Sequence, residues 1–114
     1  MNVEDYREYC LKKSGVTESF PFDQTTLVFK VGGKMFALAD IDMFNFINLK
    51  CDPERSIELR ESYSGIKEGY HMDKKHWNSV YLDADIPIAL LLELIDHSYD
   101  LVRSSLPKKI KDEL

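Results

Sequence analysis

The sequence predicts a two-layer α+β domain in which helices cover one side of a β-sheet. Two observations lead to this class. First, two β-forming runs flank the pair Gly32–Gly33, which is the pattern of a tight hairpin between strands. Second, apolar residues recur with helical spacing through residues 88–102, which predicts a long helix that packs across the sheet. The 114 residues correspond in length to one domain, 1–114, without repeats or an internal boundary.

Composition and charge narrow the class of protein. Hydrophobic residues make up 44% of the chain and charged residues 31%, as in ordinary soluble proteins. No apolar run approaches the ~20 residues that cross a bilayer, and the acidic N-terminus does not resemble a secretory signal. We therefore expect a cytoplasmic protein without membrane contact, in which Cys10 and Cys51 are reduced and buried. The net charge of −5 disfavours non-specific coating of DNA but leaves room for a local basic patch.

The N-terminal segment predicts an amphipathic helix followed by a loop. Helical spacing places on one stripe the residues Val3, Tyr6, Tyr9, Cys10 and Lys13. Gly15 follows as a helix stop. The next segment, Phe20–Pro21–Phe22, is a proline-containing loop, and we expect its two aromatic rings to lie against the body of the domain.

The hairpin is the most clearly predicted element. Its strands comprise residues 26–31 and 34–39. A two-residue turn between them would pair Phe29 with Phe36 and Leu27 with Leu38. We expect these four side chains to share the core face, because this register agrees with the hydrophobic pattern.

A third strand and a second helix follow the hairpin. Residues 44–50 predict the strand, whose Asn45 and Asn48 either display amides on the open face of the sheet or simply face water. The helix begins at Asp52–Pro53–Glu54, because Asp is a favoured N-cap and Pro suits the first helical position. Gly65 is the expected stop.

The C-terminal part predicts a fourth strand and the longest helix. Residues 80–82 alternate as a strand does, and Asp85–Ile86–Pro87 then marks a helix start. Pro107 ends this helix. The remaining residues, 108–114, form a charged tail that we expect on the surface.

Residues 69–83 hold the most versatile side chains, including the only Trp and two of the three His. They lie in the connection that leads into the fourth strand, and connections on a rigid scaffold often carry function. Lys can pair with phosphates, Trp can stack on a base and Asn can bond a base edge. The candidate nucleic-acid contacts are Lys34, Lys50, His71, Lys74, Lys75, His76, Trp77 and Asn78. The alternative is that Tyr70 and Trp77 pack on the sheet while the two Lys are solvated.

Metal-binding and catalytic patterns find little support in the sequence. Plausible metal ligands are His71, His76, Cys51, Asp73 and His97, but no pair has the short spacing typical of zinc sites. Cys51 precedes a helix start, which can activate a thiol, yet the neighbouring Asp52 opposes the thiolate. Gly32–Gly33 is a turn between strands and not a phosphate-binding loop. We therefore expect no enzyme, metal or cofactor.

Several blocks of the sequence resemble the MmcQ/YjbR family. They are the Phe20–Pro21–Phe22 loop, the hairpin 27–36, the junction 48–53, the segment 69–78 and the group 96–99. The likeness extends over nearly the whole chain. It implies a frataxin-like (CyaY-like) fold with helices packed on an antiparallel sheet. It also implies DNA binding through an arrangement described as a double wing.

Two functions are therefore expected. The first is a small cytoplasmic DNA-binding protein that uses the basic and aromatic loop together with the hairpin. The alternative is a module without enzymatic activity that binds a protein or a small molecule, with Tyr70, Trp77 and Tyr81 partly exposed along a groove. In either case we expect a monomer or a weak dimer.

Overall fold

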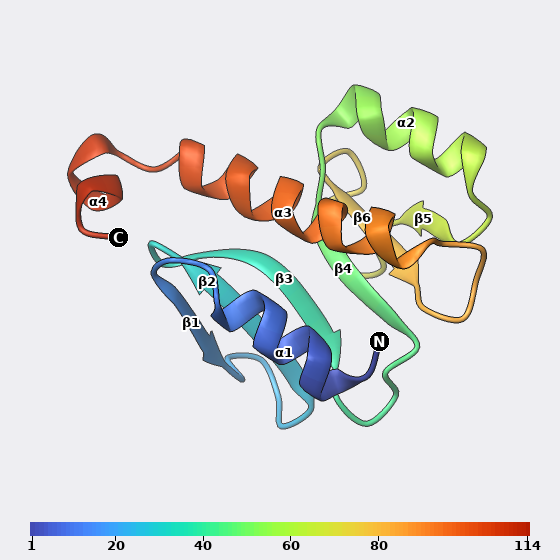
Figure 1. The fold of residues 1–114 in the computed structure, drawn as a ribbon, viewed down its shortest axis with the longest axis horizontal. Helices are drawn as coiled ribbons and strands as arrows, with labels where there is room; N and C mark the ends of the chain where they lie inside the picture. Colours follow the sequence, from blue (N-terminus) through green and yellow to red (C-terminus); the bar gives the residue numbers. More distant parts are fainter.

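The computed structural model describes all 114 residues and shows an antiparallel sheet of six strands with helices packed against it (Figure 1). The strands are β1 (Val16–Ser19), β2 (Thr26–Val31), β3 (Lys34–Asp40), β4 (Phe46–Lys50), β5 (Ile66–Glu68) and β6 (Trp77–Tyr81). They lie in the order β1-β2-β3-β4-β6-β5. The helices are α1 (Val3–Leu11), α2 (Pro53–Ser62), α3 (Ile88–Ser104) and α4 (Lys108–Asp112). The predicted α+β class is confirmed.

The core lies between the sheet and the helices α1 and α3. Tyr6 of α1 is fully buried, its ring meets Phe29 edge-on at 5.4 Å, and its hydroxyl donates to the Leu38 carbonyl at 3.2 Å. On the α3 side, the rings of Phe36 and Tyr99 meet edge-on at the same separation. These contacts fix both helices to one face of the sheet. The opposite face, which we call the open face, has no helix across it (Figure 1).

Local capping explains where the helices begin. The Asn2 side chain accepts a hydrogen bond from the Asp5 amide at 2.8 Å and starts α1. Asp52 accepts from the Arg55 amide at 3.0 Å and Pro53 takes the first position of α2, as predicted. The long helix α3 begins directly after Pro87. No helix is both long and apolar enough to span a bilayer.

The predicted hairpin register is wrong beyond the turn, because a β-bulge interrupts it. Val31 faces Lys34 as expected, but Phe29 pairs with Ala37 and Leu27 with Ala39. Phe36 is therefore an extra residue on β3, and every side chain after it changes face. Leu38 consequently lies on the open face, where it packs against Val28 and Trp77 instead of joining the core.

Three elements had no clear sequence pattern. The short strands β1 and β5 form the two edges of the sheet, and each carries only one apolar residue. Short polar edge strands resist pairing with other chains, but they are hard to recognise in a sequence. The C-terminal tail contains helix α4, whose Ile110 packs against the core together with Leu114. The tail is therefore not purely surface.

Other expectations need smaller corrections. Strand β4 begins at Phe46 rather than residue 44, and β6 begins at Trp77 rather than residue 80. The rings of Phe20 and Phe22 are exposed and do not lie buried against the body of the domain. Cys10 and Cys51 are free and buried, as predicted.

Substitution of the two glycines of the hairpin turn should lower the stability of the protein to different extents. Both have positive φ, +58° at Gly32 and +80° at Gly33, which costs another residue roughly 1 kcal/mol. A methyl group at Gly32 would also lie 2.5 Å from the buried Leu106, whereas one at Gly33 would meet nothing within 4 Å. We expect Gly32→Ala to lower the free energy of unfolding by about 2–4 kcal/mol and Gly33→Ala by only about 1 kcal/mol. Urea denaturation measures both, and equal losses would contradict the packing of Leu106 on the turn.

Candidate binding groove on the open face of the sheet

Trp77 and Asn78 lie within strand β6 and not in the connection before it. Trp77 is 8% exposed and Asn78 is 3% exposed. Trp77 packs with Val28 and Leu38 on the open face, and Met72 lies against this cluster. This burial leaves neither side chain free to stack on a base or bond its edge. The expected contact of Trp77 with nucleic acid is therefore corrected, because this side chain packs on the sheet. The expected contact of Asn78 is corrected as well, because its side chain makes an internal polar contact.

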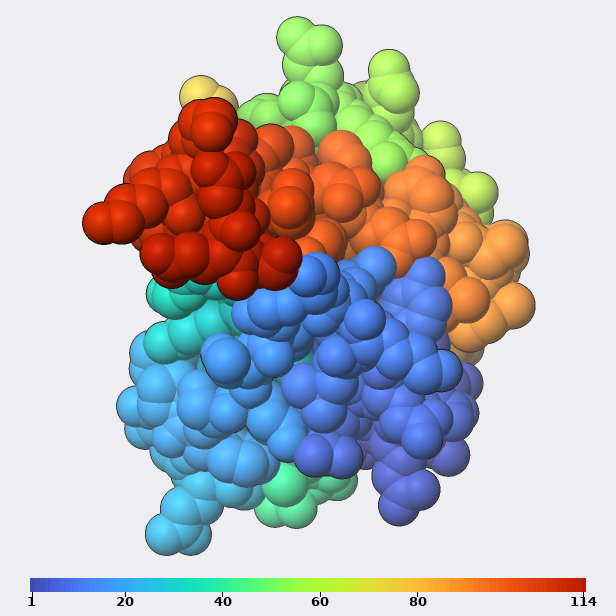
Figure 2. Space-filling view, turned by 60° about the vertical axis from the view of Figure 1, so that its left-hand side comes forward, coloured from blue at the N-terminus to red at the C-terminus, as the bar shows by residue number.

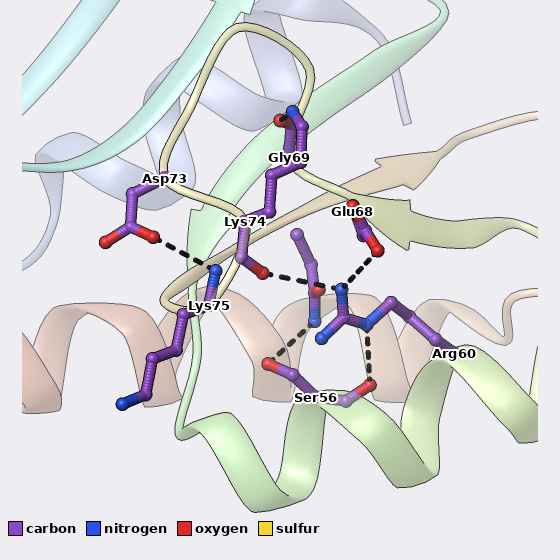
Figure 3. Close-up of polar contacts among 8 residues, drawn as sticks. Ser56, Arg60, Glu68, Gly69, Asp73, Lys74 and Lys75 are labelled. Carbon is purple, nitrogen blue, oxygen red and sulfur yellow. Dashed lines mark hydrogen bonds and ion pairs between the residues drawn. The ribbon is translucent and has the colours of Figure 1, made fainter.

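Asn78 belongs to a polar cluster beside helix α2, of which Figure 3 labels Ser56, Arg60 and Glu68. Its Nδ2 donates to Ser56 Oγ at 3.2 Å, while its Oδ1 is buried without a hydrogen-bond partner. Arg60 Nε donates to the Ser56 carbonyl at 3.2 Å, and Arg60 Nη1 reaches the Lys74 carbonyl at 3.4 Å and Glu68 Oε1 at 3.9 Å. Arg60 therefore ties α2 to β5 and to the turn before β6.

Local bonds also engage most of the polar groups in residues 73–76. Lys74 Nζ donates to the Gly69 carbonyl at 2.8 Å. His76 Nδ1 lies 2.6 Å from Asp73 Oδ2, and the Lys75 amide donates to Asp73 Oδ1 at 3.0 Å. These bonds lower the pKa of the Asp73 carboxyl, and the bond from His76 contributes most. Only the Lys75 ammonium projects freely (Figure 3).

A short hydrogen-bond chain holds the loop 69–72 on the open face. The Tyr70 amide donates to Ser79 Oγ at 2.9 Å, and Ser79 Oγ donates to Asn48 Oδ1 at 2.5 Å. Asn48 Nδ2 then donates to the Tyr70 carbonyl at 3.2 Å. Asn48 is therefore buried under the loop. Its amide is not displayed on the open face and does not face water, so neither of the two expectations for Asn48 holds. Closed polar networks of this kind rigidify the segment that they hold.

A groove of about 680 Å³ opens on this face, between the loop 70–73 and the loop that precedes β2. Its main apolar lining is Phe22, Met35, Leu38, Phe46, Tyr70 and Met72. Its polar lining is Asp23, Thr26, Asp40, Asn48, His71 and Asp73. The volume falls in the range of small-molecule sites, and a mostly apolar wall with a few polar groups is typical of them.

Aromatic rings form one side of the groove. Tyr70 is 58% exposed and meets Phe46 edge-on, with ring centroids 5.9 Å apart. Phe46 in turn lies 5.1 Å from the ring of Tyr81. The His71 ring is 4.1 Å from Tyr70, and His71 has φ +58°, in the left-handed region that non-glycine residues seldom adopt. Tyr70 is exposed and Tyr81 is partly exposed, as the ligand-binding alternative requires, but Tyr81 does not line the groove and Trp77 is buried.

Three lysines without a polar partner lie at the end of the sheet that carries the hairpin turn. Lys34 directly follows the hairpin turn. Lys50 pairs with Trp77 at the start of β6, and Lys75 precedes Trp77 by two residues. The antiparallel register places all three toward the end of the sheet that carries the turn. Helix α4, with Lys108, Lys109 and Lys111, packs at the same end (Figure 2). Lys34 and Lys50 therefore lie at the same end of the sheet but on opposite faces, because Lys34 pairs with the core residue Val31 and Lys50 pairs with Trp77 of the open face. The structure thus brings them together only in part, and neither lines the groove.

The side chains considered for metal binding or catalysis are dispersed. Burial is the main cause that raises the pKa of the Cys51 thiol, which opposes the thiolate that a nucleophile requires. His97 Nε2 accepts from the Asp52 amide at 3.2 Å, and burial lowers the pKa of this imidazole. No three His, Cys, Asp or Glu side chains converge into a group that could hold a metal ion.

The structure defines a small α+β protein with a groove on the helix-free face of an antiparallel sheet. The YjbR family model matches residues 11–101, and the chain belongs to the YjbR family. The uncharacterised proteins YbdF of Escherichia coli O157:H7 and YjbR of E. coli K12 are 43% and 30% identical to it. The alignments cover 93% and 96% of this chain and 88% and 93% of those proteins.

A solved structure shares the fold. The crystal structure of Deinococcus radiodurans protein DR2400, which carries the family-model domain DUF419, is 44% identical with a TM-score of 0.93. The match covers 98% of this chain and 86% of that one. A Pseudomonas syringae protein, at 28% identity, has a TM-score of 0.74 over 90% of this chain and 99% of that one.

The bond chain beneath the loop predicts the effect of removing one hydroxyl. Ser79→Ala leaves the Tyr70 amide and the Asn48 carbonyl oxygen without their shared partner, so we expect the free energy of unfolding to fall by about 1–3 kcal/mol. Amide hydrogen exchange at Tyr70 should accelerate more than exchange in α3. The control Ser104→Ala removes an exposed hydroxyl that bonds only within its own helix turn. If Ser79→Ala behaved like this control, the chain would not anchor the loop.

Proposed function

We propose that this protein is a binding module without enzymatic activity, and that its ligand occupies the groove on the open face. The observation that carries this proposal is the groove itself, about 680 Å³ of partly enclosed space between two loops. Ligand sites in proteins are usually preformed and concave, with apolar walls. Here the Ser79–Asn48–Tyr70 bonds hold one wall in place before any ligand arrives.

The exposed aromatic groups beside the groove support the same proposal. Phe22 is 64% exposed and Tyr70 is 58% exposed, and both rings line the groove from separate loops. Keeping large apolar side chains in water is unfavourable at about 25 cal/mol per Å², so contiguous exposed apolar surface tends to mark interaction sites. The left-handed backbone at His71 adds strain beside these rings, and such strain concentrates at ligand-binding sites.

The acidic side chains of the groove favour binding over catalysis, because loop amides already engage them. Asp23 accepts from the amides of Thr25 and Thr26, at 2.9 and 2.6 Å. Asp40 accepts from the amides of residues 42 and 43, at 2.9 and 3.0 Å. A general base needs a raised pKa near neutrality, whereas the Asp23 bonds lower the pKa of that carboxyl.

We place the protein in the cytoplasm, with which its free, buried cysteines agree.

A neutral aromatic probe tests the groove. Naphthalen-1-ylmethanol titrated into ¹⁵N-labelled protein should shift the amide resonances of residues 22–26, 38–40 and 70–73. Tyr70→Ala should weaken this binding about fivefold, since a stacked aromatic pair contributes about 1 kcal/mol. The control Ile57→Ala removes a comparably exposed apolar side chain from α2 and should leave the affinity unchanged. Shifts spread evenly over the surface would contradict the proposal.

A second candidate function, binding of nucleic acid, is favoured by the register that brings Lys34, Lys50 and Lys75 to one end of the sheet. Helix α4 adds three further lysines there. Ammonium groups that neutralise phosphates release counterions and make binding salt-dependent. This candidate uses phosphate contacts alone, because Trp77 and Asn78 are buried. A family-typical double wing would then correspond to the hairpin turn and its neighbours.

Charge reversal at the hairpin turn tests the second candidate. Fluorescence anisotropy of labelled duplex DNA should show affinity that falls with salt, and Lys34→Glu should weaken it and reduce the salt slope by about one. The matched control is Lys67→Glu in edge strand β5, away from the turn, which changes the net charge by the same amount. No measurable binding at low salt, or equal losses in both variants, would remove this candidate.

A further inference from the structure

We propose that the groove selects small organic cations, meaning a ligand with an aromatic or aliphatic body that carries an ammonium-type group. This inference rests on the proposed function and specifies the chemistry of its ligand. It comes from the charges around the groove: three carboxylates, Asp23, Asp40 and Asp73, line it, and no Lys or Arg does.

Two of these carboxylates have no cationic partner. The oxygens of Asp23 accept only from the amides of Thr25 and Thr26 and from their hydroxyls. Asp40 accepts only from loop amides. Backbone amides stabilise a carboxylate without cancelling its charge, so the negative field of both groups extends into the groove. The bonds to Asp23, from the Thr26 and Thr25 amides first, lower the pKa of its carboxyl and keep it ionised at neutral pH.

The remaining titratable and charged groups lie beside the groove, and none of the cationic ones lines it except His71. His76 lies against Asp73 and offsets its charge only when the imidazole is protonated. Lys74 is directed to the Gly69 carbonyl. His71 lines the groove with its ring against Tyr70. Two lysines share the open face without lining the groove: Lys30 is the strand partner of Met35, and Lys50 is two residues from Asn48.

The walls fit the remainder of such a ligand. Phe22, Phe46 and Tyr70 line the groove with aromatic rings. Cations are attracted to the faces of such rings, and the attraction strengthens where water is excluded. Met35 and Leu38 supply an apolar floor for the body of the ligand. A phosphate or carboxylate in the same place would face three carboxylates and would be repelled.

The inference is tested with three naphthalene probes of nearly equal shape. Naphthalen-1-ylmethylammonium is a cation, naphthalen-1-ylmethanol is neutral and naphthalene-1-carboxylate is an anion. By NMR titration at low salt, the cation should bind about tenfold more tightly than the alcohol, and the anion more weakly still. Each carboxylate a few ångströms from the ligand contributes a few-fold in affinity, and 0.5 M salt should reduce the preference.

Isosteric variants locate the source of the preference. The triple variant Asp23→Asn, Asp40→Asn and Asp73→Asn keeps an acceptor oxygen at each position, and it should bring the cation and the alcohol to within about twofold of each other. The control variant Glu58→Gln, Glu61→Gln and Asp100→Asn neutralises three exposed helix carboxylates outside the groove and should keep the preference. Circular dichroism verifies that both variants are folded.

The possible outcomes separate this inference from the proposed function. If all three probes bind in the groove with equal affinity, the groove is a ligand site but the cation preference is wrong. If the control variant loses the preference as fully as the triple variant, overall charge and not the groove is its source, which also overturns the inference. If no probe shifts the groove resonances, the proposed function fails and the inference fails with it.

Discussion

The β-bulge at Phe36 is the constraint on which both faces of the sheet depend. Because Phe36 is an extra residue opposite β2, strand β3 turns Phe36 and Ala37 toward the core and Leu38 toward the open face. A regular ladder would have placed Phe36 and Leu38 on the same side. The bulge thus lets one short strand complete the core under α1 and α3 and also supply the floor of the groove. An irregularity in the pairing is therefore part of the construction of the site.

The parts of the fold that could be predicted from sequence are those determined by neighbouring residues. Asp52 and Pro53 define the start of α2 through a side-chain cap and a fixed φ, and both act within one helical turn. The Gly32–Gly33 turn is equally local. The bulge is not, because it depends on how Phe36 fits among distant core side chains such as Tyr99. The edge strands escaped prediction because polar, solvent-facing residues carry little periodic signal.

The candidate site was predictable only in part, because it also depends on residues that are far apart in the sequence. The sequence singles out the segment 69–78, and the structure places Tyr70, His71 and Met72 of this segment along the groove. The sequence left open whether Trp77 is displayed or packs on the sheet, because a Trp beside charged residues has the same pattern in both cases. The groove also needs Phe22 and Asp23, which precede this segment by some fifty residues, and no spacing rule connects the two loops.

The anchoring of the loop 69–72 has a consequence for how the family can diversify. The bonds that fasten this loop run from Ser79 and Asn48 to the backbone nitrogen and oxygen of Tyr70, and not to its side chain. Any residue except proline offers the same two backbone atoms. The side chain at position 70 can therefore change without loosening the wall that carries it. Single substitutions there change the surface of the groove, while the sheet and the hydrogen bonds that hold the loop stay as they are.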